Sequence, residues 1–362
     1  MRLIDSNILS DTIGIQAIEF GRTLIISTNK DIEYQTVEKA GDIESTEKVT
    51  PEDNVYKKVE AFFSGETRVD SVDVVGKTGL AEAAGIKAFL DTVIEKNDNF
   101  LFVFLDTFNK ELVTGLVGWA VANKKFPVYA TPTTLSISEV EGMVETFNSR
   151  AIAFDGDDHI EAKAVGFMTT TVPGYLPWSW RRLQGIQKNP RPASEQRKLL
   201  NAKVNFANEE RRGVYVVVPG QTTSGEFIKN EWGKVNMEDD MHIAMVNLLT
   251  SNDPVGHPGA DPGDASRIYQ ALYEVIQDYA GNDRKFIATW TDEEIQAGAN
   301  AQPGDPKAYV KVKTKYTQAD IKAGIFSVEW AAMPRGECLE GKIQGLLTFD
   351  INKIKGGQAS GV

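Results

Sequence analysis

The sequence holds little of the chemistry on which most catalytic and metal sites depend. Cys338 is the only cysteine among 362 residues, so an internal disulfide and a zinc site built on paired thiolates are both excluded. The three histidines, His159, His242 and His257, lie far apart along the chain. No apolar run approaches the roughly 20 residues that span a bilayer, and we therefore expect no membrane partner.

Positive charge is also scarce, since the formal net charge is -12. Nucleic-acid binding needs a basic surface, so we expect no nucleic-acid partner. The charge is uneven, with nine acids and four lysines in residues 31–60, but nine bases and three glutamates in residues 181–212. We hypothesise that the basic segment meets an acidic surface of a neighbouring subunit, and the alternative is two solvated faces. The candidate charged subunit contact consists of Arg181, Arg182, Arg211 and Arg212.

Familiar site motifs are missing where the chain comes nearest to them. Val74–Gly79 lies between a predicted strand and helix, but a phosphate-binding loop needs a glycine where the predicted strand has Ser71. The acidic run Asp155–His159 lacks the ligand spacing of a calcium loop. No serine or cysteine motif marks a nucleophile for a histidine. We therefore predict no catalytic, cofactor-binding or metal-binding residues, and an architectural protein rather than an enzyme.

Hydrophobic periodicity predicts an α/β domain over residues 21–180. Short apolar runs alternate with helical patterns of 10–15 residues, which is typical of a mostly parallel sheet. The predicted strands are 24–27, 69–75, 100–105, 126–130 and 150–154, and the predicted helices are 55–64, 81–95, 111–123 and one that Ser138 caps. Glu141 is the expected capping-box partner of Ser138.

The pattern changes after a stretch rich in proline and glycine, which predicts a second domain of the α+β class over residues 181–340. Its predicted strands are 213–218, 309–315 and 325–331, and its predicted helices are 239–250, 318–323 and one that Asp264 caps and Gly281 ends.

Both ends of the chain carry alternating apolar residues without a hairpin partner nearby. These residues are Ile13, Ile15 and Ala17 at the start, and Leu347, Phe349 and Ile351 at the end. A strand needs an edge to pair with, so we predict that residues 1–20 and 341–362 are arms that add strands to neighbouring subunits. The alternative is that both strands pair with edges of their own chain.

Several segments, in this order, resemble contractile tail sheath proteins of myophages and related contractile injection systems. They are Phe20-Gly21 before the strand 24–27, Tyr56 with Ala61–Ser64, Pro173-Gly174 followed by Trp180, Leu183 and Gly185, Gly213–Tyr215, and Thr223–Ile228 before the helix and Gly/Pro loop. Each piece is weak alone, and the ordered set covers most of the chain.

The resemblance implies a structural subunit that polymerises as stacked hexameric rings in a helical tube around a tail tube. Contraction of this sheath would drive the tube through the host envelope, using energy stored at assembly and no cofactor. The implied partners are further copies of the chain, the tail tube protein, and the baseplate and tail terminator proteins. The implied location is the tail of the virion, after assembly in the host cytoplasm.

Two other interpretations stay open at this stage. The first is a small-molecule enzyme with a doubly wound domain, whose site would lie at the carboxyl ends of the strands, near Asp106 or Thr131. The second is another structural component of a tail or baseplate.

Overall fold

A computed structural model describes residues 22–336, apart from residues 46–47, 66–68, 211–212, 282, 298 and 300. The first half of this range alternates strands and helices. Its elements are β1 (Thr23–Ser27), β2 (Ile32–Val37), the short 3-10 helix η1 (Ala40–Asp42), α1 (Asn54–Phe62), β3 (Val72–Gly76), α2 (Ala83–Ile94), β4 (Phe102–Leu105), α3 (Lys110–Ala122), β5 (Phe126–Thr131), α4 (Ile137–Thr146), β6 (Ile152–Asp155) and α5 (Ile160–Met168).

A six-stranded sheet with the order β2-β3-β1-β4-β5-β6 organises this half. The strands β3, β1, β4, β5 and β6 run parallel, and only β2 runs antiparallel, at the edge beside β3. Taken alone, the five parallel strands have the order 2-1-3-4-5 of a doubly wound fold, with its switch point between β1 and β4. The sequence prediction of an α/β class with a mostly parallel sheet is confirmed.

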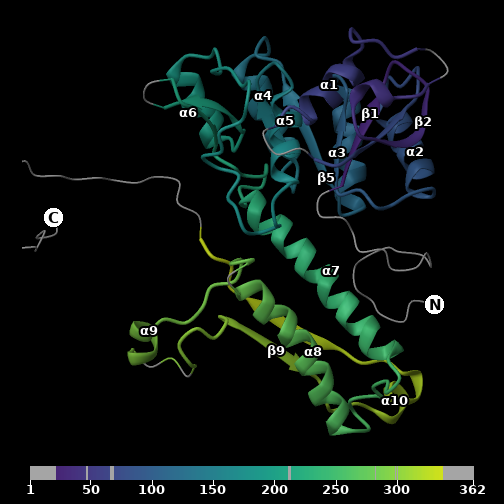
Figure 1. The fold of residues 1–362 in the computed structure, drawn as a ribbon, viewed down its shortest axis with the longest axis vertical. Helices are drawn as coiled ribbons and strands as arrows, with labels where there is room; N and C mark the ends of the chain where they lie inside the picture. The colour runs from purple at the N-terminus through teal and green to yellow at the C-terminus, as the bar shows by residue number, and fades with distance from the viewer. Residues whose placement is uncertain are drawn as a thin grey trace, which may run out of the picture.

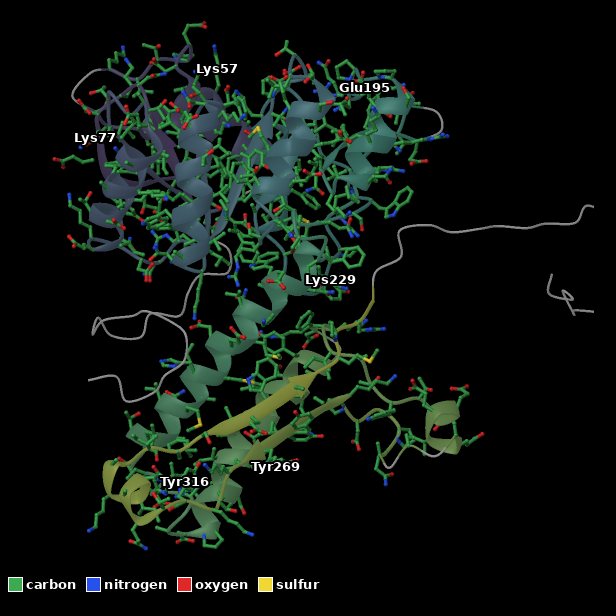
Figure 2. All side chains as sticks on the ribbon, turned by 180° about the vertical axis from the view of Figure 1, so that it is seen from behind. Lys57, Lys77, Glu195, Lys229, Tyr269 and Tyr316 are labelled. Atoms are coloured by element: carbon green, nitrogen blue, oxygen red, sulfur yellow. The ribbon has the colours of Figure 1, made fainter. Side chains whose placement is uncertain are left out.

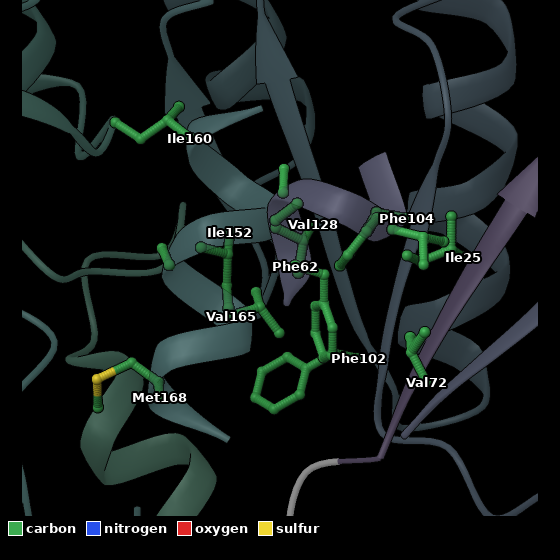
Figure 3. Packing of buried hydrophobic residues seen from close by; sticks show 14 of the residues in the cluster. Ile25, Phe62, Val72, Phe102, Phe104, Val128, Ile152, Ile160, Val165 and Met168 are labelled. Atoms are coloured by element: carbon green, nitrogen blue, oxygen red, sulfur yellow. The ribbon is translucent and has the colours of Figure 1, made fainter. Parts of the chain in front are cut away.

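Helices cover both faces of the sheet, because alternate residues of each buried strand point to opposite sides. On one face, Ile25, Phe104 and Val128 pack against α1 and α5, as Figure 3 shows for part of this cluster. On the other face, Leu24 and Val103 pack against α2, α3 and α4.

The second half contains longer helices and pairs of antiparallel strands. Its elements are α6 (Ala193–Asn201), β7 (Phe206–Glu209), β8 (Tyr215–Val218), α7 (Ile228–Thr250), α8 (Pro262–Ala280), α9 (Asp292–Gln296), β9 (Ala308–Val312), α10 (Gln318–Ala323) and β10 (Val328–Ala332). β7 pairs with β8, and β9 pairs with β10. None of the helices in the described ranges is long and apolar enough to cross a membrane.

The 23-residue helix α7 passes from one apolar core to the next (Figure 1). Its first turns bury Ile228 and Trp232 in the cluster beneath the large sheet. From Met237 onward it packs in a separate cluster with α8 and with the strands β9 and β10. The domain limits predicted from the sequence, with a change at residue 180, stay predictions, while the change of apolar core occurs within α7.

Three predicted helix starts are wrong. The N-cap of α4 is Ser136, whose capping-box partner is Glu139, and not Ser138 with Glu141. Two overlapping Ser-x-x-Glu patterns compete here, and the earlier one wins because it also buries Ile137. The long helix α7 begins at Ile228 and not at residue 239. The N-cap of α8 is Asp261 and not Asp264. Pro262 follows it in the first turn, where a backbone N–H has no partner within the helix, so proline removes no helical hydrogen bond.

Candidate assembly surfaces and the carboxyl edge of the sheet

The carboxyl ends of β1 and β4 form the switch point where a doubly wound enzyme would hold its ligand. Asp106 lies there, almost completely buried. Its carboxylate accepts hydrogen bonds from the Ser27 hydroxyl at 3.0 Å, and from the Thr28 amide at 3.1 Å and hydroxyl at 3.0 Å. Burial raises the pKa of Asp106, and the hydrogen bonds from Thr28 and Ser27 oppose that rise. The carboxylate is engaged in holding two strand ends together.

The neighbouring strand ends are closed by a second buried network. Asp155 accepts hydrogen bonds from the Arg191 guanidinium at 2.8 and 2.9 Å, from the Asn189 amide at 2.7 Å, and from the Thr131 hydroxyl at 3.1 Å. The hydrogen bonds and charge of Asp155 raise the pKa of Arg191 against the effect of burial. The two positions where the enzyme interpretation places its site, Asp106 and Thr131, are thus both bonded to other side chains of the chain.

The segment Val74–Gly79 forms no phosphate loop. Gly76 ends β3 against Ser27 and the carbonyl of Lys30, and a Cβ there would lie 2.3 Å from that carbonyl oxygen. The Thr78 amide donates to Asp31 at 2.8 Å, so the turn is bonded to its own chain.

The acidic side chains of the run Asp155–His159, after β6, do not share one site. Asp155 belongs to the buried network, Asp157 accepts from the Thr133 hydroxyl at 2.7 Å, and Asp158 is exposed. Across the part of the chain that the structure describes, no three histidine, cysteine, aspartate or glutamate side chains lie close enough to hold a metal ion.

Two of the large aromatic side chains, and His257, serve packing. Trp178 and Trp232 are buried with Phe102 beneath the sheet, whereas Trp180 is 42% exposed. His257 bonds to the Ile325 carbonyl at 2.8 Å and packs edge-on against Tyr316.

The basic segment is only partly available as a contact surface. Arg191 is buried in the network above, and Lys188 pairs with Glu209 at 2.9 Å. Arg182 is exposed and Arg181 is half-buried. The other two predicted contact residues, Arg211 and Arg212, lie outside the described residues, so a contact formed by all four stays a prediction.

The pair β9–β10 is the feature best suited to assembly. One face of it packs against α8 with Val310 buried and Trp330 half-buried, and the other face exposes Tyr309. No third strand pairs with the outer edge of either strand within residues 22–336 as described. Such edges offer backbone groups to a strand from another chain. The predicted arm residues Ile13, Ile15, Ala17, Leu347, Phe349 and Ile351 all lie outside the described residues.

Comparisons with known proteins identify the fold. The sequence matches no protein-family model and no curated protein. The structure matches the sheath complex of an extracellular contractile injection system, PVC, in its contracted state, with a TM-score of 0.65, 13% identity, and coverage of 95% of this chain and 98% of that one. It also matches the contracted helical sheath of the anti-feeding prophage, with a TM-score of 0.62, 12% identity, and coverage of 95% and 98%.

A third match is a chain in the six-fold symmetrised baseplate of the anti-feeding prophage, with a TM-score of 0.64, 11% identity, and coverage of 94% of this chain and 97% of that one. The chain therefore has the fold of proteins in contractile injection systems along nearly its whole length. This agrees with the resemblance that the ordered sequence segments indicated.

Proposed function

We propose that this chain is a non-enzymatic structural subunit of a contractile sheath, of the kind found in phage tails and related injection systems. The likeness to contracted sheath structures over 95% of the chain carries the proposal. A fold alone does not fix a function, so the local features must agree with it. They do, because the carboxyl edge of the sheet is bonded to its own chain while β9–β10 offers edges to other chains.

In this proposal the arms at residues 1–20 and 341–362 add strands to the β9–β10 pairs of neighbouring copies. Each copy both gives and receives strands, and such head-to-tail contacts build open helical arrays rather than closed pairs. The copies would form hexameric rings stacked around a tail tube, with baseplate and terminator proteins at the ends. Contraction would repack the subunit faces while the arms stay paired, and would drive the tube through the host envelope.

The experiment is to purify the full chain and to compare it with chains that lack residues 1–18 or residues 342–362. Negative-stain microscopy and sedimentation velocity should show tubes or stacked rings for the full chain and soluble monomers for both truncated chains. Circular dichroism provides the control that the truncated chains stay folded. If all three sediment alike as monomers at high concentration, the sheath proposal is wrong.

A charged contact at Arg181, Arg182, Arg211 and Arg212 is a further part of the proposal. Reversing these four charges should raise the concentration at which tubes form, since the acidic partner surface would then repel them. Assembly of the unaltered chain should also weaken as salt screens the contact. Turbidity measured against protein and salt concentration tests this, and an unchanged assembly threshold would remove the contact from the proposal.

The match to a baseplate chain supports one alternative, in which the subunit caps the sheath at the baseplate instead of forming its length. Electron microscopy separates the two, because a baseplate subunit would form single rings and no long tubes.

A further inference from the structure

Trp180 combines an exposed side chain with a strained backbone. It is 42% exposed, and its φ of 63° lies in the left-handed region that bulky side chains rarely adopt. Two backbone hydrogen bonds fix this conformation, from the Trp180 amide to the Val217 carbonyl at 2.8 Å and from the Val217 amide to the Arg181 carbonyl at 2.9 Å. The backbone therefore holds a large aromatic ring at the surface.

A single copy of the chain gains little from this arrangement. Glycine adopts the same φ without strain, and a polar side chain suits an exposed position better than an indole ring does. Backbone strain of this kind clusters at functional sites. The exposed Arg182 lies two residues further on, and tryptophan and arginine are enriched at the centres of protein interfaces. Trp180 and Arg182 are called the aromatic knob below.

The same chain carries a concave surface that fits such a knob. An open groove of about 840 Å³ lies between α7 and α8, which run side by side in the lower part of Figure 1. Its apolar lining is half-buried and comes from Ala244, Leu248, Ala271 and Val275. The volume is in the range of sites that hold drug-sized molecules, so the groove has room for an indole ring.

The charge of the groove favours a basic partner. Four carboxylates and two guanidinium groups line it, from Asp240, Asp253, Glu274 and Asp278, and from Arg267 and Arg284, so negative charge is in surplus. The two arginines pair with the three aspartates. Glu274 is exposed and accepts a hydrogen bond from the neutral amide of Gln270 at 2.9 Å. It is therefore the carboxylate of the groove best suited to pair with a guanidinium from another chain.

We propose that the aromatic knob of one copy inserts into the α7–α8 groove of a neighbouring copy, with Arg182 paired to Glu274. The inference rests on the proposed sheath assembly and assigns a partner to part of its charged contact. Because the chain has a net charge of -12, a second copy presents the acidic surface that a basic knob requires. The knob follows α5 beside β8 and does not line the groove, so the contact is head-to-tail and extends into an open array.

The first test reverses the two charges in the full chain. Arg182→Glu and Glu274→Lys both change exposed side chains, so the fold is kept. Each substitution alone should raise the concentration at which tubes form by about tenfold, because like charges then face each other. The chain with both substitutions restores an opposite pair and should assemble near the original threshold. If it assembles no better than the single variants, Arg182 does not meet Glu274 and the inference is overturned.

The second test is Trp180→Gly, which removes the ring and the backbone strain together. The variant should keep its circular dichroism spectrum and raise the assembly threshold by about tenfold or more, as expected for an interface centre. The matched control is Lys124→Gly, which relieves the same kind of strain after α3, where φ is 59°, and should assemble like the unaltered chain. A folded Trp180→Gly variant with an unchanged threshold would overturn the inference. If this variant does not fold, the charge reversal decides alone.

Sedimentation and turbidity of the purified chain measure both thresholds, and they separate this inference from the proposed function. Tubes that form equally well from the unaltered chain and from all knob and groove variants would leave the groove to a different partner, and would overturn this inference alone. Failure of the unaltered chain to assemble at all would overturn the proposed function, and this inference with it.

Discussion

At the scale of single residues, the buried charged groups that the structure describes are bonded to other groups of the chain rather than left open for chemistry. Arg191 is the clearest example, since its guanidinium contacts Asp155 through two nitrogens and also donates to the Leu135 carbonyl at 2.8 Å. Asp155 ends β6 in the large sheet, while Arg191 precedes α6, so this pair joins the sheet to the chain that follows it. Its role is therefore structural.

We predict that Arg191→Met lowers the free energy of unfolding by about 3–5 kcal/mol, because Asp155 then keeps a buried charge without its main partner. Urea unfolding followed by circular dichroism measures this. Arg197→Met is the control, since Arg197 is exposed, and surface substitutions of this kind change stability by only about 0.5 kcal/mol. Similar losses for the two variants would contradict a structural role of the pair.

A second residue-scale feature concerns Asp239 in α7. Burial, with the neighbouring charge of Asp240, raises the pKa of Asp239 from 3.8 to about 6. The folded chain then binds this proton more tightly than the unfolded chain. The stability that Asp239 contributes is complete below about pH 4 and is lost as pH rises through 6.

We predict that Asp239→Asn removes this loss. The variant should match the original chain near pH 4 and exceed its stability at pH 8 by on the order of 1–2 kcal/mol, a range that allows for solvent screening of a half-buried group. Chemical unfolding at both pH values measures the difference. Asp283→Asn, at an exposed position, should show no such trend. A stability difference that is equal at both pH values would disprove the assignment.

At the scale of elements, the helices beneath the sheet approach each other at glycine. Gly166 of α5 lies against α1, and a Cβ there would lie 2.1 Å from the carbonyl oxygen of Phe62. Gly142 of α4 is exposed, and a Cβ there meets nothing within 4 Å. The same substitution should therefore have opposite effects at the two positions.

We predict that Gly166→Ala destabilises the chain by about 1–3 kcal/mol, through overpacking against a backbone that cannot move freely. Gly142→Ala should stabilise it by about 1 kcal/mol, because alanine is the better helix former. Thermal unfolding of both variants gives the comparison. If Gly166→Ala also stabilises, α1 and α5 do not pack as closely as described.

The elements also show what sequence patterns predict and what they miss. Strands such as β1 and β4 are predictable because they are continuous apolar runs buried on both faces. The first half of α7 is missed because its buried positions include Lys229, Gly233 and Asn236, which break the apolar stripe. These residues are buried by tertiary contacts that no local pattern contains.

The features of the candidate site are likewise predictable only where a local sequence pattern encodes them. The apolar alternation of 309–315 and 325–331 predicts the strands β9 and β10, and the structure shows that they pair. In contrast, the buried ion pair of Lys58 with Glu161 joins residues that lie far apart along the chain. No sequence pattern indicated that Lys58 and Glu161 would meet, because their pairing depends on the packing of α1 against α5.

At the scale of the whole molecule, one joint connects the large sheet to the part that carries β9–β10. The Phe286 ring packs on two glycines, since a Cβ at Gly174 or at Gly233 would lie 2.7 Å from it. Beside it, the buried ammonium of Lys229 donates to the Arg335 carbonyl at 2.9 Å, where α7 leaves the upper part (Figure 2). The Arg335 amide in turn donates to the Phe286 carbonyl at 2.8 Å. The joint therefore holds both the start of α7 and the last described residues of the chain, 334–336.

In the proposed sheath, a load on the predicted arm at residues 341–362 would reach the large sheet through residues 334–336, so the packing of this joint would matter. We predict that Phe286→Ala costs about 3–5 kcal/mol and uncouples the two apolar cores. Calorimetry should show one unfolding transition for the original chain and two for the variant. Tyr309→Ala, at an exposed position on β9, should leave a single transition. If Phe286→Ala also unfolds in one step, the cores are coupled along α7 itself, and the aromatic contact is not what joins them.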